Sequence, residues 1–346
     1  MTLSGRRTYR YNIYNYIRPS FFTMPNLTVA VLAPNDYAKD LGKKGTVSDI
    51  TFYNLKKGAD TVTFVEPTRY PEKISSLFFT LSLADSVLFV VDQIDARFGE
   101  CVLEIQSAGL KKGRIILKNY ITVEQIAPLI EGTVLQHYAV IPEEFISLRD
   151  TCLAEAAKKS GKGNVRSGAS GGSVPVDHHY NVKGVGIVVL GCVTEGVIRK
   201  HDTLKVLPSG STAQVRSIQK HDDDADSAVA GDRVGLALKN VEAEDIDRGF
   251  VLTSDPTVKS AKTITAKASL VKYWPSPIKE GMVICVGHWM QFVTSRVESV
   301  VAEHDWRMPT LTITLSSELV YPPGATAVLH YLEGGKLRVI GSMKLP

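Results

Sequence analysis

Residues 29–40, VAVLAPNDYAKD, have the outline of a phosphate-binding loop. Four apolar, strand-like residues run into a turn, and the chain then reaches Lys39. In phosphate-cradling loops a lysine at the end of the turn contacts the β- and γ-phosphates, while glycines let backbone amides approach the ligand. Those glycines are missing here. The segment is therefore an altered nucleotide site, a disabled one, or a plain strand and turn.

No other catalytic or metal-binding pattern stands out in the sequence. The eight histidines show no ligand spacing, and no Ser-His-Asp arrangement can be argued. The four cysteines occur singly, without a Cys-x-x-Cys pair, which fits a reducing cytoplasm and argues against structural zinc. We therefore expect a cytoplasmic protein with no catalytic residue, no metal site and no resident cofactor.

The elements that would position Lys39 form an α/β domain over residues 24–159. Short runs rich in Val and Ile alternate with helix-like segments, which predicts a parallel sheet with helices on both faces. The predicted strands are residues 29–32, 61–65, 86–91, 114–118 and 138–141. The predicted helices are residues 72–84, 98–110, 123–132 and 143–159.

Two all-β units follow this domain. Residues 160–173 contain five glycines and four serines, and we interpret them as a flexible linker. Beyond the linker, short strands recur at regular spacing without helices. This pattern predicts one β-barrel over residues 174–257 and a second over residues 258–346. The predicted fold is a doubly wound α/β domain followed by two barrels.

The net charge of +4 originates in residues 1–23, which hold four arginines and no acid, so that 36 basic residues balance 36 acidic ones in the remainder. With its four tyrosines this basic head could stack on RNA. We favour instead a leader without structure, or a numbering that begins upstream of the true start codon at Met24.

No apolar run approaches the ~18 residues that span a membrane. We expect no membrane or DNA partner, and any RNA-binding face must be local.

The most specific pattern lies in the first predicted barrel. The segments NVKGVGIVVLG (181–191), AVAGDRVGLAL (228–238) and IDRGFVL (246–252) anchor a match of roughly eighty residues. They resemble the second domain of translational GTPases of the EF-Tu type, most closely the archaeal SelB-like branch. The resemblance implies that the α/β domain is similar to the family's GTPase domain. It also implies that the last barrel is similar to the third domain, which grips the T-arm of tRNA.

In that register the first loop lacks the residues of a phosphate cradle. The family's pattern is Gly-x-x-x-x-Gly-Lys-Ser/Thr. Here Ala33 and Ala38 replace the glycines, Lys39 persists, and Asp40 replaces the hydroxyl residue that holds magnesium. If the glycine positions need positive φ, each alanine costs ~1–2 kcal/mol. Asp40 would also direct a negative charge at the phosphates.

The other nucleotide motifs are altered as well. Glu66 and Arg69 stand where the family has the Asp and Gly of Asp-x-x-Gly, residues 118–121 (KNYI) replace Asn-Lys-x-Asp, and the late Ser-Ala loop is absent. Most of the first switch region is missing, and residues 44–46 would be its remnant. We interpret the domain as a pseudo-GTPase that keeps the scaffold. This combination resembles the SelB-like paralogue of pyrrolysine-using archaea.

The resemblance also implies a surface for the aminoacyl end of tRNA. The matching positions are Asp177, His178 and Tyr180 on one segment, Arg233 on a facing strand, and Arg248 near the CCA end. Arg233 can hold a phosphate or carboxylate as a fork, and His178 can exchange a proton near neutral pH, which favours a charged or strongly polar ligand. Structural alternatives stay open: an ion pair of Asp177 with Arg233, a surface-turn position without a binding role for His178, and a turn-stabilising surface charge for Arg248.

The last barrel offers weaker candidates for RNA contact around the segment GHWMQFVTSR. These candidates are Lys279, His288, Gln291 and Arg296. The neighbouring Trp289 and Phe292 are expected in the core.

Three functions remain open on the sequence. The first is a monomeric, elongation factor-like protein that binds an aminoacyl-tRNA, for example one carrying pyrrolysine, and has lost GTP binding and hydrolysis; the ribosome would be a further partner. The second is a divergent GTPase that still binds GTP and Mg²⁺ through Lys39. The third is a ribosome- or RNA-associated regulator. We favour the first.

Overall fold

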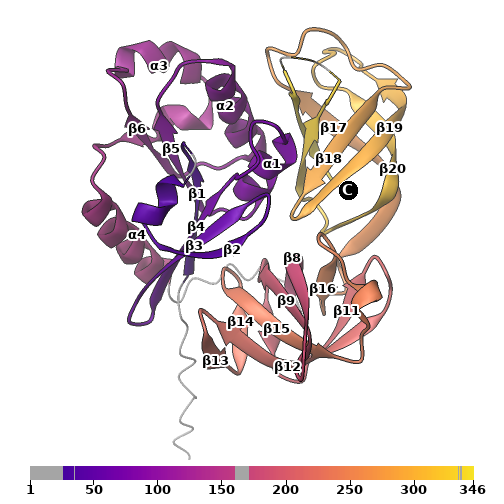
Figure 1. The fold of residues 1–346 in the computed structure, drawn as a ribbon. Helices are drawn as coiled ribbons and strands as arrows, with labels where there is room; N and C mark the ends of the chain where they lie inside the picture. Colours follow the sequence, from indigo (N-terminus) through magenta and orange to yellow (C-terminus); the bar gives the residue numbers. More distant parts are fainter. Residues whose placement is uncertain (1–25, 35, 160–170, 334, 336) are drawn as a thin grey trace, which may run out of the picture.

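The computed structural model describes residues 26–34, 36–159, 171–333, 335 and 337–346. The predicted leader, and all but the last three residues of the predicted linker, lie outside them. Figure 1 shows three units, and each contacts the other two. They are an α/β domain, a first barrel and a second barrel, as the sequence predicted. No helix in the described part of the chain is long and apolar enough to cross a membrane.

The α/β domain is built on a seven-stranded sheet of order β2-β3-β4-β1-β5-β6-β7. From β4 to β7 neighbouring strands are parallel, as predicted. These strands are β1 (Asn26–Leu32), β4 (Asp60–Glu66), β5 (Ser86–Val91), β6 (Gly113–Leu117) and β7 (Ala139–Val140). The carboxyl ends of β1 and β4 carry the segments that matched nucleotide motifs.

Helices cover both faces of this sheet, and all four predicted helices are present. Successive residues of β1 point to opposite faces of the sheet, and each face has its own core. Ala30 and Leu32 belong to the core under one set of helices, and Val29 and Val31 belong to the core under the other. The first set is α1 (Ile74–Ser82), α2 (Ala96–Ala108) and α3 (Val123–Ile130), with the 3-10 helix η2 (Val134–His137) beside it. The second is α4 (Phe145–Lys159) with the 3-10 helix η1 (Tyr37–Asp40).

A hairpin that the sequence pattern did not predict extends the sheet at one edge. β2 (Lys43–Val47) and β3 (Thr51–Lys57) both run antiparallel to their neighbours, so the sheet is not purely parallel. The segment predicted to be a switch remnant, 44–46, belongs to the edge strand β2. A two-residue turn joins β3 to β4, and Gly58 supplies its positive φ of 63°.

The first barrel closes through the pairing of β11 with β12, which joins the two sides of the strand order β11-β16-β8-β9-β15-β12. β8 and β9 approach so closely that a Cβ on Gly191 would lie 2.4 Å from the carbonyl oxygen of Pro175. The ring strands are β8 (Ser173–Val182), β9 (Gly186–Cys192), β11 (Thr203–Leu207), β12 (Thr212–Lys220), β15 (Arg233–Lys239) and β16 (Val251–Thr253). Shorter elements are β10 (Val197–Arg199), β13 (Asp223–Ala225), β14 (Ser227–Val229) and the 3-10 helix η3 (Ala243–Asp245).

The second barrel is closed in the order β17-β20-β19-β18-β21-β22 and packs against α1 and α2. At that joint Glu104 of α2 contacts His330 at 3.0 Å, with both side chains fully buried. Phe78 of α1 fills the space above Gly287. The strands are β17 (Lys259–Leu270), β18 (Val283–His288), β19 (Gln291–Val301), β20 (Thr310–Tyr321), β21 (Thr326–His330) and β22 (Val339–Lys344).

Candidate functional site

The segment that resembles a phosphate loop forms a short, closed turn. Asp36 has a left-handed φ of 62°, η1 makes a single turn, and β2 begins at Lys43. In nucleotide-binding loops the turn leads into a helix whose N-terminal amides face the phosphate. Here the chain returns to the sheet edge as a strand, so the helix that would complete such a cradle is replaced by the β2–β3 hairpin.

A carboxylate of the protein itself occupies the loop. The amide of Ala38 donates to Oε1 of Glu66 at 2.5 Å, and the Tyr53 hydroxyl lies 3.2 Å from Oε2 of the same side chain. The Tyr53 hydroxyl is also 2.9 Å from Oδ1 of Asp36. Burial raises the pKa of Glu66, against the bond from Ala38, which lowers it. The amide that would face a phosphate thus already has an acceptor.

The remaining residues of the predicted nucleotide site lie outside this hydrogen-bonded group. Lys39 and Asp40 are exposed on η1, Arg69 is exposed beyond β4, and Ala33 is half-buried at the end of β1. The structure therefore brings Ala38 and Glu66 together and leaves the others apart. Tyr53, which fixes Glu66, was not among the predicted site residues, because β3 was not recognised as a strand.

The predicted tRNA-binding residues gather at a polar seam between the α/β domain and the first barrel. Asp177 and His178 lie on β8, and Arg233 begins β15. Both carboxylate oxygens of Asp177 accept from the Arg233 guanidinium, with Nη2 to Oδ1 at 3.1 Å. Nδ1 of His178 lies 2.7 Å from Oδ1 of Asp177. The ion pair left open by the sequence is present.

Asp177 is ionised in this arrangement. Burial alone would raise the pKa of its carboxyl, but the charge of Arg233 and the hydrogen bonds from His178 and Arg233 outweigh burial and hold the pKa at about 2. The same pair raises the pKa of the Arg233 guanidinium despite its burial. The arginine fork is therefore fully engaged by the protein's own carboxylate.

The α/β domain covers this surface with residues 48–52, which we name the seam turn; they connect β2 to β3 and begin β3. Oγ of Ser48 lies 3.0 Å from Nε2 of His178, and Arg233 Cζ sits 3.8 Å from the centroid of the Phe52 ring. Sequence motifs gave no indication that Ser48 and Phe52 contact the first barrel, because the residues they contact are more than a hundred positions away.

Arg248 and Tyr180 mark the two ends of the seam. Nη1 of Arg248 donates to Oδ1 of Asp49 in the seam turn at 2.5 Å, and its Cζ lies 4.3 Å from the Phe79 ring centroid. Tyr180 stacks on His178 with ring centroids 6.4 Å apart and is 46% exposed. Charged groups thus line the covered part of the seam, and an aromatic ring stands at its open edge.

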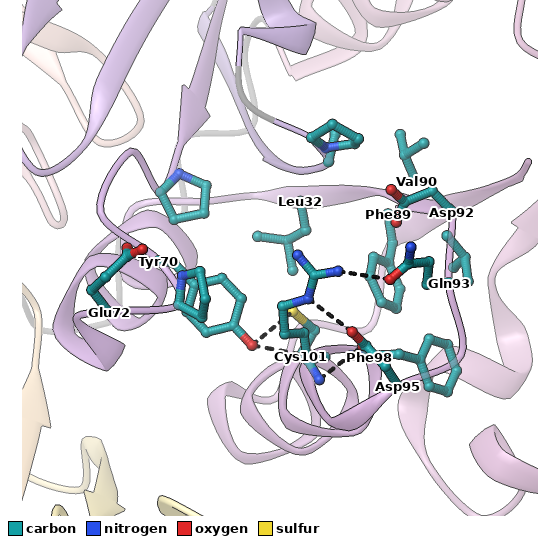
Figure 2. A pocket seen from close by; sticks show the side chains of 16 residues that line it. Leu32, Tyr70, Glu72, Phe89, Val90, Asp92, Gln93, Asp95, Phe98 and Cys101 are labelled. Atoms are coloured by element: carbon teal, nitrogen blue, oxygen red, sulfur yellow. Dashed lines mark hydrogen bonds and ion pairs between the residues drawn. The ribbon is translucent and has the colours of Figure 1, made fainter.

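A cavity of about 320 Å³ lies at the carboxyl ends of β1 and β5, where the strand order reverses. Phe89 and Phe98 stack in its wall with centroids 5.6 Å apart, and Figure 2 shows Tyr70 across from them. Arg97 is the one cation among the described residues that line the cavity, and Asp95 binds it at 2.9 Å. Among the described residues that line it, the cavity therefore offers no unpaired cation to a phosphate.

The candidates in the second barrel divide by burial. His288 is 7% exposed and Gln291 is 6% exposed, and the Gln291 side chain bonds both backbone groups of Val320. The prediction that these two residues face RNA is therefore wrong. Lys279 and Arg296 are exposed. Among the residues expected in the core, Phe292 packs against Phe78 and Phe79 at the joint with α1, whereas Trp289 is half-buried.

Comparisons with known proteins agree with this architecture. The profile of the family "Elongation factor Tu domain 2" matches residues 186–253. An uncharacterized protein of Methanocaldococcus jannaschii is 34% identical over 324 residues, covering 93% of this chain and all of that protein. The selenocysteine-specific elongation factor of the same organism is 28% identical over 264 residues, which are 70% of this chain and 55% of that factor. The crystal structure of apo translation elongation factor SelB from Methanococcus maripaludis has a TM-score of 0.75 at 22% identity, covering 92% of this chain and 79% of that one.

Proposed function

We propose a function on the premise that this chain belongs to the EF-Tu/SelB-type family of translational GTPases. In this proposal it is an elongation factor-like protein that binds an aminoacyl-tRNA at the seam between the α/β domain and the first barrel. It neither binds nor hydrolyses GTP, and the α/β domain serves as a scaffold.

One juxtaposition carries the proposal. In the α/β domain the segment that resembles a phosphate loop is filled by Glu66, whose carboxylate accepts from the amide of Ala38. At the seam between this domain and the first barrel, the charged residues Asp177 and Arg233 remain together. A phosphate would have to displace a tethered carboxylate in a loop that also holds Asp36. A tRNA end at the seam would also have to displace a carboxylate, that of Asp49 from Arg248, but it would then face arginine and histidine side chains.

The seam suits a polar, anionic ligand such as the 3′ end of a charged tRNA. Arg248 would contact a phosphate, and Tyr180 would supply an aromatic wall for a base or for the attached amino acid. His178 would stand between them as a donor or acceptor. Because charged groups dominate, we propose that the seam takes a charged or strongly polar part of its ligand. The further proposal that the attached amino acid is an unusual one, such as pyrrolysine, rests on the family resemblance alone.

The wider setting follows from the same proposal. The protein would act in the cytoplasm as a monomer and deliver or protect its tRNA near the ribosome. No resident cofactor is needed. GTP with Mg²⁺ would bind only if Glu66 left the amide of Ala38 in the segment that resembles a phosphate loop.

Two measurements test the proposal together. Calorimetry with GTP and Mg²⁺ is expected to give no binding heat, and the ester of a bound aminoacyl-tRNA is expected to hydrolyse more slowly than the free ester. Run across several charged tRNAs, the second assay also identifies the preferred amino acid. Tight, magnesium-dependent GTP binding would contradict the loss of the nucleotide site, and equal hydrolysis rates with and without protein would contradict tRNA binding.

A matched pair of variants locates the binding surface. Arg248→Gln at the seam is expected to remove protection of the ester. Arg199→Gln, which neutralises an exposed arginine on β10 of the same barrel, is expected to retain it. Equal effects of the two substitutions would point to general charge attraction rather than a defined site.

A further inference from the structure

We propose that the seam turn is an internal stand-in for the ligand, which covers the binding surface until a tRNA end displaces it. The inference rests on the proposed function, because the covered residues are those assigned there to tRNA. It adds a means of regulation that needs no nucleotide.

Arg248 shows that the present occupant fills its site incompletely. Asp49 engages one nitrogen of the guanidinium, whereas Nε and Nη2 are buried and find no acceptor among the described residues. Buried donors without acceptors are costly and uncommon in proteins. A phosphate presents several acceptor oxygens to an arginine fork, so it could satisfy nitrogens that the Asp49 carboxylate leaves unbonded.

Asp49 is nevertheless a competent substitute anion. Burial raises the pKa of its carboxyl, but the hydrogen bond and charge of Arg248 lower it below its ordinary value. The carboxylate is therefore charged, as a phosphate would be.

The other two contacts complete the likeness to one nucleotide. The centroid of the Phe52 ring lies 3.8 Å from Cζ of Arg233, a place that a stacked base could take, and the Ser48 hydroxyl meets His178, as a ribose hydroxyl would. An anion, a planar ring and a hydroxyl thus occupy three neighbouring side chains of the barrel. A terminal nucleotide carries the same three groups.

The seam can open because polar contacts hold it. The apolar cluster of the first barrel contains barrel residues alone among those described, whereas the second barrel shares Met290 and Val328 with a cluster of the α/β domain. Ile50 and Phe52 are anchored in that same cluster. Exposure of the binding surface therefore requires the first barrel to move away from the α/β domain, while the seam turn stays folded in its apolar cluster.

The test removes the charge of the stand-in without removing its volume. In Asp49→Asn the bond to Arg248 loses its ionic character, so the seam turn is displaced more easily. The dissociation constant for aminoacyl-tRNA is therefore expected to fall by about tenfold. Arg248 in the unliganded variant is also expected to react several times faster with phenylglyoxal, followed by mass spectrometry. That second readout does not depend on tRNA.

Lys56→Met is the matched control. Lys56 bonds Asp223 at 2.5 Å between the same two units but outside the seam turn, so neither Arg248 labelling nor tRNA affinity should change by more than about twofold. Faster labelling and tighter binding in Asp49→Asn alone support the proposal. Equal gains in both variants would overturn it, because they would indicate general loosening.

Two further outcomes separate this inference from the proposed function. If Arg248 in Asp49→Asn is labelled at the wild-type rate, the stand-in is overturned. If the wild-type protein still protects the tRNA ester in that case, the proposed function is unaffected. Faster labelling with no binding of charged tRNA by either protein would overturn both, because the turn would then cover Arg248 without standing in for a tRNA end.

Discussion

Replacing Asp177 by asparagine should destabilise the protein because it strands a buried cation. The Asp177 side chain is fully buried and that of Arg233 is 11% exposed. The substitution keeps the shape of the side chain and one hydrogen-bond acceptor, but it removes the charge that Arg233 faces. The first barrel and the seam both depend on this pair.

The magnitude follows from two estimates. The pKa of Asp177 falls from 3.8 to about 2, and at ~1.36 kcal/mol per unit this contributes roughly 2 kcal/mol at neutral pH. Breaking a buried pair and leaving one charge costs ~3–5 kcal/mol. Because the asparagine oxygen retains one bond, we expect a loss of about 3 kcal/mol in the free energy of unfolding at pH 7.

The pH dependence provides a second, independent check. Since the pKa of Asp177 is depressed in the folded state, its contribution is complete above about pH 4 and is lost as the pH falls toward about 2. Denaturant unfolding of wild type and Asp177→Asn should therefore converge as the pH is lowered. A difference below about 1 kcal/mol at pH 7, or one that is independent of pH, would refute the reasoning.

Asp226→Asn is the control for this experiment. Asp226 pairs with Lys200 at 3.0 Å in the same barrel, but its side chain is 93% exposed. Exposed pairs contribute little, so its loss should be within about 0.5 kcal/mol and should depend on salt.

Three other substitutions test separate parts of the structure by denaturant unfolding. Glu66→Ala leaves the loop amide without its acceptor and should cost ~1–3 kcal/mol without creating GTP affinity by calorimetry; a gain in GTP affinity would show that the carboxylate alone blocks the site. Glu104→Gln weakens the buried contact to His330 and should cost about 2 kcal/mol; a neutral effect would mean that this joint rests on apolar packing. Gly191→Ala sets a Cβ against the carbonyl of Pro175 and should cost ~1–3 kcal/mol, whereas unchanged stability would show that β8 and β9 separate easily.

Much of the fold could be predicted because periodicity and turn residues are local properties of the chain. The helices and parallel strands of the α/β domain each carry their own pattern, and the barrels were placed by strand spacing and by the resemblance of residues 181–252. The β2–β3 hairpin was missed because Thr51, Phe52 and Tyr53 are buried in succession, which removes the alternation expected of a strand with one exposed face. Gly58 was the available signal, since it marks a two-residue turn.

The site was predicted less completely because its geometry depends on distant contacts. The pairing of Asp177 with Arg233 could be anticipated from charge and facing positions. Nothing local indicates that Ser48 and Asp49 lie against residues 130 and 199 positions away. Gln291 was misplaced for the same reason: an amide side chain suggests a surface, but here it serves buried backbone groups of β20.

Under the proposed function, the two joints of the α/β domain explain how a factor without a nucleotide switch responds to a ligand. A ligand shifts a conformational equilibrium only by its difference in affinity for the two states. At the joint with the second barrel, Phe78 and the Glu104–His330 contact are buried away from the seam residues assigned to tRNA. At the seam, Ser48, Asp49 and Phe52 have counterparts in a nucleotide in the proposed mechanism, and the two unbonded nitrogens of Arg248 favour the incoming phosphate over Asp49. In the proposed mechanism, the binding energy of the tRNA therefore opens the seam directly, and release follows when Asp49 returns to Arg248.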